Sequence, residues 1–235
     1  MNRISSSIAS IERPLVTVDV VIFSVINEQL CVLMVRRPTS PEEPFPGLLA
    51  IPGGFIDVMQ DASLMECARR KLQQKTGVVS PYLEQLGSWG GVLRDPRGWS
   101  CTHVYFALVT QQAELDGISD AQWVTCEQAL GQKLAFDHGE LLSCAIERLR
   151  SKVEYTSLPA FLLAEPFTLP QLQHVYEIIL ARPLDKSAFR RRMLDAGFLV
   201  ESGVVTKEQG RPAASFCIRD RGQATLFPRT FKSAH

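Results

Sequence analysis

The sequence contains no apolar run of the roughly 18 to 20 residues that a membrane-spanning helix requires. Its opening residues, MNRISSSIASIERP, also lack the apolar stretch of a secretory signal. The six cysteines are scattered through apolar contexts, and no two of them form a CxxC pair. This spacing favours buried, reduced thiols over disulfides or a zinc site. We therefore expect a cytoplasmic protein with no membrane partner and no structural metal.

The chain has no net charge, but its charges are unevenly distributed. Residues 1–155 hold 14 basic and 18 acidic side chains, whereas residues 156–235 hold 11 basic and 7 acidic ones. All the basic residues of this second part lie at or after Arg182. Clustered Lys and Arg release counterions from phosphate backbones, so the basic C-terminal part favours a polyanionic partner. A solvated basic surface is the alternative.

Length and composition indicate two soluble globular domains, because domains usually run about 100 to 200 residues and the 235-residue chain is 46% hydrophobic. Two β-branched apolar runs flank a short polar connection: LVTVDVVIFSV begins at Leu15, and LCVLMVRR ends at Arg37. This pattern predicts a buried hairpin. Strands and helices alternate after it, which predicts an α+β sandwich. The expected divisions are a flexible terminus at 1–13, a sandwich domain at 14–153, a linker at 154–167, a second domain at 168–221 and a tail at 222–235. Within the sandwich, strands are expected at 82–89, 103–109 and 122–124, and helices at 63–76 and 136–153.

The most specific motif is the segment IPGGFIDVMQDASLMECARRKLQQKTGV, which spans residues 51–78. A strand end, a double glycine, a loop and an amphipathic helix closed by Gly77 follow one another here. The arrangement resembles the Nudix box, whose helix reads R-E-U-x-E-E-x-G-U. Arg70 and the apolar positions match this pattern, but Lys71, Gln74 and Lys75 occupy its three glutamate positions.

These three residues remove the metal-binding chemistry of the box. Positions i, i+3 and i+4 share one helical face, where glutamates would form the carboxylate site that Mg²⁺ prefers. Here two ammonium groups repel a divalent cation, and the neutral amide between them supplies no anionic ligand. We therefore expect a catalytically inactive Nudix fold that binds no metal at this face. Metal held by Asp57, Asp61 and Glu66 is the alternative, and Gln60 or Asp61 stands nearest to the loop glutamate of the family.

Our hypothesis is that ligand binding survives the loss of the metal, because the lysines supply the positive charge that Mg²⁺ presents to a pyrophosphate. The turn LRDPRGW adds two guanidinium groups suited to phosphate or ribose oxygens and an indole suited to stacking on a base. The alternatives are an Arg/Asp-stabilised turn with a half-buried Trp, a structural Arg37 and a helix-capping His138. The predicted ligand-binding residues are Arg37, Gly53, Gly54, Phe55, Lys71, Lys75, Arg94, Arg97, Trp99 and His138.

A new unit follows the apolar segment YTSLPAFLLAEPF. Thr168 and Gln171 fit a capping box at the start of one helix, and Asp185 caps a second helix, KSAFRRRMLDAG, that ends at Gly197. Two short strands joined by a basic loop come next. Helix, turn, basic helix and hairpin is the order of a winged helix-turn-helix, whose second helix enters the major groove of DNA. A small helical dimerisation domain with solvated arginines is the alternative.

The predicted DNA contacts lie on the second helix and in the basic loop. Arginine is the usual reader of guanine, whereas flanking Lys and Arg more often hold phosphates. The predicted DNA-binding residues are Lys186, Ser187, Arg190, Arg191, Arg192, Lys207 and Arg211.

Together the two halves resemble the NrtR family, the Nudix-related transcriptional regulators of NAD metabolism. The resemblance covers the chain from Leu15 to about Asp220, in the segments PGGFID, ARRKL before QQKTGV, RDPRGW, LAFDH, EPFTLPQLQHVYE, LDKSAFRRR and GRPAASF. It implies a Nudix-like α/β/α sandwich with a mixed sheet, which senses ADP-ribose or a related NAD-derived nucleotide. It also implies a winged-helix domain that represses NAD biosynthesis and salvage genes as a homodimer on palindromic operators.

Two other functions remain open at this point. Some relatives keep hydrolase activity, so one alternative is an active ADP-ribose pyrophosphatase with an accessory winged-helix domain. The other is a metabolite-sensing module whose C-terminal domain contacts RNA or protein. The last 14 residues, GQATLFPRTFKSAH, indicate no function.

Overall fold

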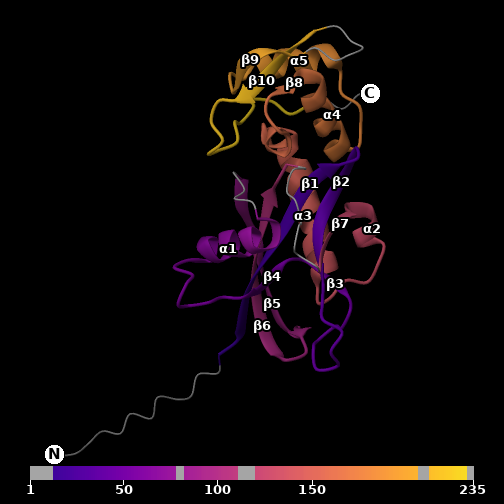
Figure 1. Ribbon diagram of the computed structural model, residues 1–235, viewed down its shortest axis with the longest axis vertical. Coiled ribbons are helices and arrows are strands. Elements are labelled where there is room, and N and C mark those ends of the chain that lie inside the picture. The colour runs from indigo at the N-terminus through magenta and orange to yellow at the C-terminus, as the bar shows by residue number, and fades with distance from the viewer. Residues whose placement is uncertain (1–12, 78–81, 111–119, 206–211, 232–235) are drawn as a thin grey trace, which may run out of the picture.

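The first β-branched run of the chain forms the central strand of a mixed sheet (Figure 1). The computed structural model describes residues 13–77, 82–110, 120–205 and 212–231. Strand β1 (Leu15–Ile26) pairs antiparallel with β2 (Gln29–Arg36) and parallel with β6 (Gly98–Leu108). β5 (Tyr82–Asp95) follows β6 at one edge, and β3 (Leu49–Ala50) and β7 (Ala121–Thr125) pair with β2. The short β4 (Gly53–Phe55) pairs with β1. The predicted hairpin is confirmed, and Asn27 and Glu28 close it with positive φ angles of 48° and 62°.

Helices cover both faces of this sheet, which confirms the α/β/α sandwich (Figure 1). α1 (Leu64–Thr76) packs Cys67, Ala68 and Leu72 against one face. On the other face, α3 (His138–Val153) packs Leu141 and Ala145, and the short α2 (Cys126–Leu130) lies in the same core. All six cysteines are free thiols.

The C-terminal part is a winged helix whose caps match their sequence signals. β8 (Phe167–Thr168) leads into α4 (Leu169–Leu180), where Thr168 and Gln171 form the predicted capping box. α5 (Lys186–Asp195) follows, with the Asp185 side chain accepting a hydrogen bond from its first turn. β9 (Leu199–Val205) and β10 (Ala213–Ile218) form the wing hairpin, and β8 completes this sheet beside β10.

The expected linker is part of the core. Residues 158–162 form a short 3-10 helix, η1 (Leu158–Leu162), and all five of its residues are buried. Phe161 is fully buried, with its ring centroid 5.7 Å from that of Tyr82 at the start of β5. A run this apolar gains more from burial than from bridging two domains through solvent, so the sandwich and the winged helix share one continuous core.

Polar contacts join the same two parts. The Arg150 side chain of α3 donates to the Ile179 carbonyl of α4 at 3.1 Å. Arg182, just after α4, pairs with Glu154 at 2.9 Å.

The sequence predicted α3 from residue 136, but it begins at His138, because Phe136 adopts a positive φ of 52°.

The tail, for which the sequence indicates no role, is folded against the protein as far as residue 231. Phe227 is buried, and Phe231 packs against the core. The predicted flexible terminus, apart from Arg13, lies outside the described residues. Among the helices that the structure describes, none is both long and apolar enough to cross a membrane.

Phe161→Ala tests whether the predicted linker is core. We expect it to lower the free energy of unfolding by about 3–5 kcal/mol, because a fully buried ring leaves a cavity. Urea denaturation of the full chain measures this. Leu130→Ala, at a side chain that is 45% exposed, serves as the control and should lose less than about 1 kcal/mol. Equal, small losses in both variants would show that residues 158–162 are a dispensable connection.

Candidate functional site

The two glycines of the Nudix-like motif lie next to charged side chains on opposite faces of the sheet. A Cβ atom on Gly53 would lie 1.8 Å from Asp19 Oδ1. A Cβ atom on Gly54, whose φ is +146°, would lie 2.9 Å from Lys71 Nζ. Position 53 has no room for a side chain, and Gly54 has a backbone conformation that favours glycine. The two glycines thus let a carboxylate approach from one face and an ammonium group from the other.

Helix α1 carries the three altered Nudix positions on its outer side. Ser63 caps its start, and Gly77, with a φ of 66°, ends it as predicted. Its buried side packs on the sheet, which leaves Lys71 and Lys75 half-exposed and Gln74 exposed. These three side chains offer two cations and an amide, so they do not fit the Mg²⁺ ion of a hydrolytic Nudix site.

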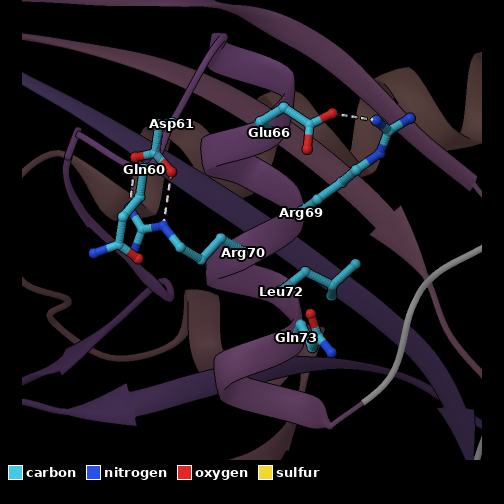
Figure 2. Close-up of a pocket in the computed structure, with 7 residues that line it drawn as sticks. All are labelled: Gln60, Asp61, Glu66, Arg69, Arg70, Leu72 and Gln73. Atoms are coloured by element: carbon cyan, nitrogen blue, oxygen red, sulfur yellow. Dashed lines mark hydrogen bonds and ion pairs between the residues drawn. The ribbon is translucent and has the colours of Figure 1, made fainter. Parts of the chain in front are cut away.

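The acids beside this helix are held by arginines. Figure 2 shows Arg70 reaching Asp61, with nitrogen–oxygen distances of 2.7 and 2.6 Å, and Arg69 reaching Glu66 at 2.7 Å. The hydrogen bonds from Arg70 hold the pKa of the Asp61 carboxyl well below its usual range, and that side chain is 1% exposed. With Gln60, Leu72 and Gln73, these four residues line a pocket of about 360 Å³.

The alternative metal site is therefore not assembled. Asp61 and Glu66 belong to the two ion pairs, and Asp57 accepts hydrogen bonds from the Met59 backbone and the Gln60 side chain. Within the described ranges, no three His, Cys, Asp or Glu side chains group as metal ligands. The Asp61–Arg70 pair instead fastens the loop after β4 to α1.

Arg94 is the centre of a buried charge network on the α3 side of the sheet. Its Nη2 lies 3.1 Å from Asp19 Oδ2, and its Nε lies 2.9 Å from Asp137 Oδ2. The side chains of Arg94 and Asp19 are each 7% exposed, and the Thr102 hydroxyl donates to Asp19 at 2.7 Å. Because Asp137 directly precedes α3, this network ties β1, β5 and β6 to the start of that helix.

His138, predicted as either a ligand contact or a cap, is buried beside this network. Its Nδ1 accepts a hydrogen bond from the Ile51 backbone at 2.8 Å. Burial lowers the pKa of the imidazole, so the ring is neutral near pH 7. Phe136 lies 5.2 Å from His138, between ring centroids, and Arg37 Cζ lies 4.9 Å from the centroid of Phe136. Arg37 also pairs with Glu43 at 2.7 Å.

The turn between β5 and β6 carries the remaining predicted ligand residues. Arg97 contacts both oxygens of Asp95, at 3.0 and 2.8 Å, and its Cζ lies 5.2 Å from the ring centroid of Phe55. Phe55 is 45% exposed and Trp99 is 51% exposed. The arginine–aspartate turn that was the structural alternative is therefore present, and it leaves two aromatic rings open to solvent.

The predicted ligand residues fall on two sides of the sheet. Lys71 lies over Gly54 on the α1 side, whereas Arg94 and His138 gather on the α3 side. Sequence reasoning missed Asp19 and Asp137 as their partners. The signal for Asp19 was available, since it is the one charged residue in the apolar strand LVTVDVVIFSVI. Among the described residues, Asp137 Oδ1 is buried without a hydrogen-bond partner.

Four of the seven predicted DNA-binding residues lie exposed on one helix, and their contact with DNA stays a prediction. Lys186, Ser187, Arg190 and Arg191 are exposed on α5, while Phe189 and Met193 hold the opposite side in the core. Among the described residues, no ion pair neutralises Lys186, Arg190 or Arg191. Lys207 and Arg211 lie outside the described residues.

Arg192 does not face outward with its neighbours. Its Nη2 donates to the Thr230 carbonyl at 2.6 Å, and its Cζ lies 4.0 Å from the ring centroid of Phe231. The prediction that Arg192 flanks the DNA surface is therefore wrong. Helical position placed it at the margin of the exposed side, and the C-terminal segment covers that margin.

Asp61→Asn tests the ion pair that anchors the loop. The folded pKa of Asp61 is below its unfolded value of about 3.9, so the pair stabilises the protein above that pH and is lost as the pH falls. We expect the variant to be less stable at pH 7, and the difference from wild type to narrow below about pH 4. Urea denaturation across a pH series measures it. Glu66→Gln, in an exposed pair with Arg69, should have a smaller effect; a pH-independent difference for Asp61→Asn would contradict this assignment.

Comparison with known proteins supports both halves of the structure. Residues 15–143 match the NUDIX domain family, and residues 159–218 match the NrtR DNA-binding winged helix domain. The chain is 47% identical over 219 residues to an ADPR responsive transcriptional repressor of Acinetobacter baylyi. The match covers 92% of this chain and 86% of the repressor.

Two solved structures of Shewanella oneidensis NrtR are also similar. The complex with a 27mer DNA has a TM-score of 0.86 and 44% identity, and the match covers 92% of this chain and 99% of that one. The NUDIX domain complexed with ADP ribose has a TM-score of 0.53 and 45% identity, over 59% of this chain and 90% of that one. Two consecutive domain matches and 47% identity to a nearly full-length relative place this chain in the NrtR family.

Proposed function

We propose that this chain is an ADP-ribose-responsive transcriptional repressor of genes of NAD metabolism. Residues 14–153 sense ADP-ribose or a related NAD-derived nucleotide, and residues 168–221 bind operator DNA. The observation that carries the proposal is a combination of two features. In the described part of the chain, the exposed basic side chains of α5 pair with no acid, and two of the three Nudix metal positions on α1 hold lysines. The repressor from A. baylyi and the DNA and ADP-ribose complexes of S. oneidensis NrtR support it.

The two sides of the sheet suit the two chemistries of the nucleotide. Lys71, above the backbone of Gly54, supplies positive charge for the pyrophosphate. On the α3 side, Asp137 has a buried carboxylate oxygen without a donor among the described residues, and such an acceptor suits a ribose hydroxyl. Phe55 and Trp99 offer exposed rings for the base.

The DNA-binding form is a homodimer on a palindromic operator. Two copies of α5, related by a two-fold axis, read half-sites about one helical turn apart, roughly 34–36 Å. Ligand binding alters operator affinity only when the nucleotide binds the DNA-bound and free forms with different affinities. A coupling of about 1–3 kcal/mol corresponds to a roughly 5- to 150-fold change in operator affinity.

Restoring the acidic residues distinguishes a receptor from an ADP-ribose pyrophosphatase. Wild-type protein should bind ADP-ribose equally with and without Mg²⁺, and should release no AMP or ribose 5-phosphate. The triple variant Lys71→Glu/Gln74→Glu/Lys75→Glu reverses the local charge, so its affinity for ADP-ribose without Mg²⁺ should fall by at least about tenfold, with recovery when Mg²⁺ is added. Calorimetry measures the affinity for ADP-ribose, and product analysis measures the release of AMP and ribose 5-phosphate. Mg²⁺-dependent turnover by the wild type would favour the enzyme.

Arg191→Ala tests the DNA surface. Loss of an exposed arginine that contacts a base or a phosphate should weaken operator binding by about 1–3 kcal/mol, or roughly 5- to 150-fold, without changing affinity for ADP-ribose. The measurement is a mobility shift at fixed salt, with DNA from upstream of the chain's own operon. Arg36→Ala, the same change at an exposed arginine that ends β2, is the matched control. Equal operator affinities for wild type and Arg191→Ala would refute the assignment of α5.

A further inference from the structure

The end of the chain connects the two domains in a way that neither domain match includes. The matched residues end at 143 for the NUDIX domain and at 218 for the winged helix. Residues 222–231, here called the strap, pair with residues 155–157, which also lie outside both matches. Ser157 N–H donates to the Thr225 carbonyl at 3.0 Å, Thr225 N–H donates to Ser157 Oγ at 2.9 Å, and Phe227 N–H donates to the Tyr155 carbonyl at 2.7 Å.

The first half of the strap thus lies against the sensing domain. Its residues Gly222, Gln223, Ala224 and Leu226 line a cavity of about 290 Å³ together with side chains of α1, β5 and α3, namely Arg69, Tyr82 and Lys152. Tyr155 and Ser157 follow α3 directly in the chain. This end of the strap is therefore packed against the sandwich.

The second half of the strap lies against the recognition helix α5. The ring of Phe231 stacks on Phe189 of α5, with centroids 6.1 Å apart and planes 15° apart. It also meets Tyr176 of α4 edge-on at 5.4 Å. Arg192 of α5 holds the same ring by its guanidinium at 4.0 Å and donates to the Thr230 carbonyl at 2.6 Å.

These contacts determine which side of α5 faces outward. Phe189 and Arg192 lie at i and i+3 on one face of the helix, and the strap contacts both of them. Arg190 and Arg191 stay exposed on the other side. The guanidinium of Arg192 thus acts as an anchor between aromatic rings, since Phe227 also lies 5.7 Å from it.

We propose that residues 222–231 are a strap that fixes the orientation of α5 relative to the sensing domain, with Phe231 and Arg192 as positioning residues for operator binding. The inference rests on the proposed DNA-binding role of α5. In this proposal the last part of the chain contributes to DNA binding, although the strap itself makes no contact with DNA. The strap acts through the helix that it holds.

Phe231→Ala in the full-length chain removes the ring without removing charge. We expect faster amide hydrogen exchange in α5 and unchanged exchange in α1. Operator affinity should fall about tenfold, whereas affinity for non-specific DNA should stay within about twofold, because it depends on the retained Lys and Arg charges. Affinity for ADP-ribose should be unchanged. Phe231→Leu, which keeps part of the packing, should recover part of the loss and replaces Phe231→Ala if that variant does not fold.

Two further variants separate positioning from other roles. Arg192→Lys keeps the charge that a phosphate contact needs but loses the planar stacking group. It should therefore behave like Phe231→Ala, and wild-type operator affinity with wild-type exchange in α5 would overturn the proposal. Arg229→Ala, at an exposed position of the strap, is the control and should change nothing.

Hydrogen exchange keeps this proposal separate from the proposed function. If the wild type binds no operator DNA, the proposed function fails, and exchange in α5 still decides whether the strap holds the helix. If Phe231→Ala lowers only the melting temperature, with α5 exchange and operator affinity of the folded protein unchanged, the strap is merely stabilising and the proposal is wrong.

Discussion

A guanidinium buried between two carboxylates organises the end of the sheet that carries the double glycine. Arg94 joins Asp19 of β1 to Asp137 at the start of α3, and removing one partner of such a buried network typically destabilises a protein by about 3–5 kcal/mol. The same network explains Gly53, because the Asp19 side chain occupies the space that a Cβ atom at position 53 would need. Glycine at position 53 is therefore required for Asp19 to reach Arg94.

The fold keeps the shape of a Nudix domain while changing the sign of its charge. Lys71 and Lys75 replace acids on the outer side of α1, yet the buried side of that helix and its caps are unaffected, because packing depends on Cys67, Ala68 and Leu72. The helix needs no metal to hold its loop, since the Arg70–Asp61 pair does so. The cationic outer side of α1 is therefore compatible with the same core packing.

Local signals explain which features the sequence predicted. The cap at Asp185 and the helix end at Gly77 depend on residues within one turn, so both were predictable. The burial of residues 158–162 and the inward turn of Arg192 depend on partners far along the chain. Nothing near Arg192 in sequence indicates that Phe231 covers it, and its helical position and charge placed it at the flank of the DNA surface. The partners of Arg94 were missed for the same reason, because they lie 75 and 43 positions away in the sequence.

The shared core restricts how a sensed nucleotide can affect DNA binding. Helix α3 begins at the charge network and ends at the contacts with α4, and its 16 residues span about 24 Å as a rigid rod. Packed interfaces change between discrete arrangements and do not deform continuously. A nucleotide that exchanged hydrogen bonds with Asp137, as proposed, would act on the start of this rod, and Arg150 and the partners of the strap lie at its other end. Because the domains share one core, the proposed communication between them is a reorientation within one packed body.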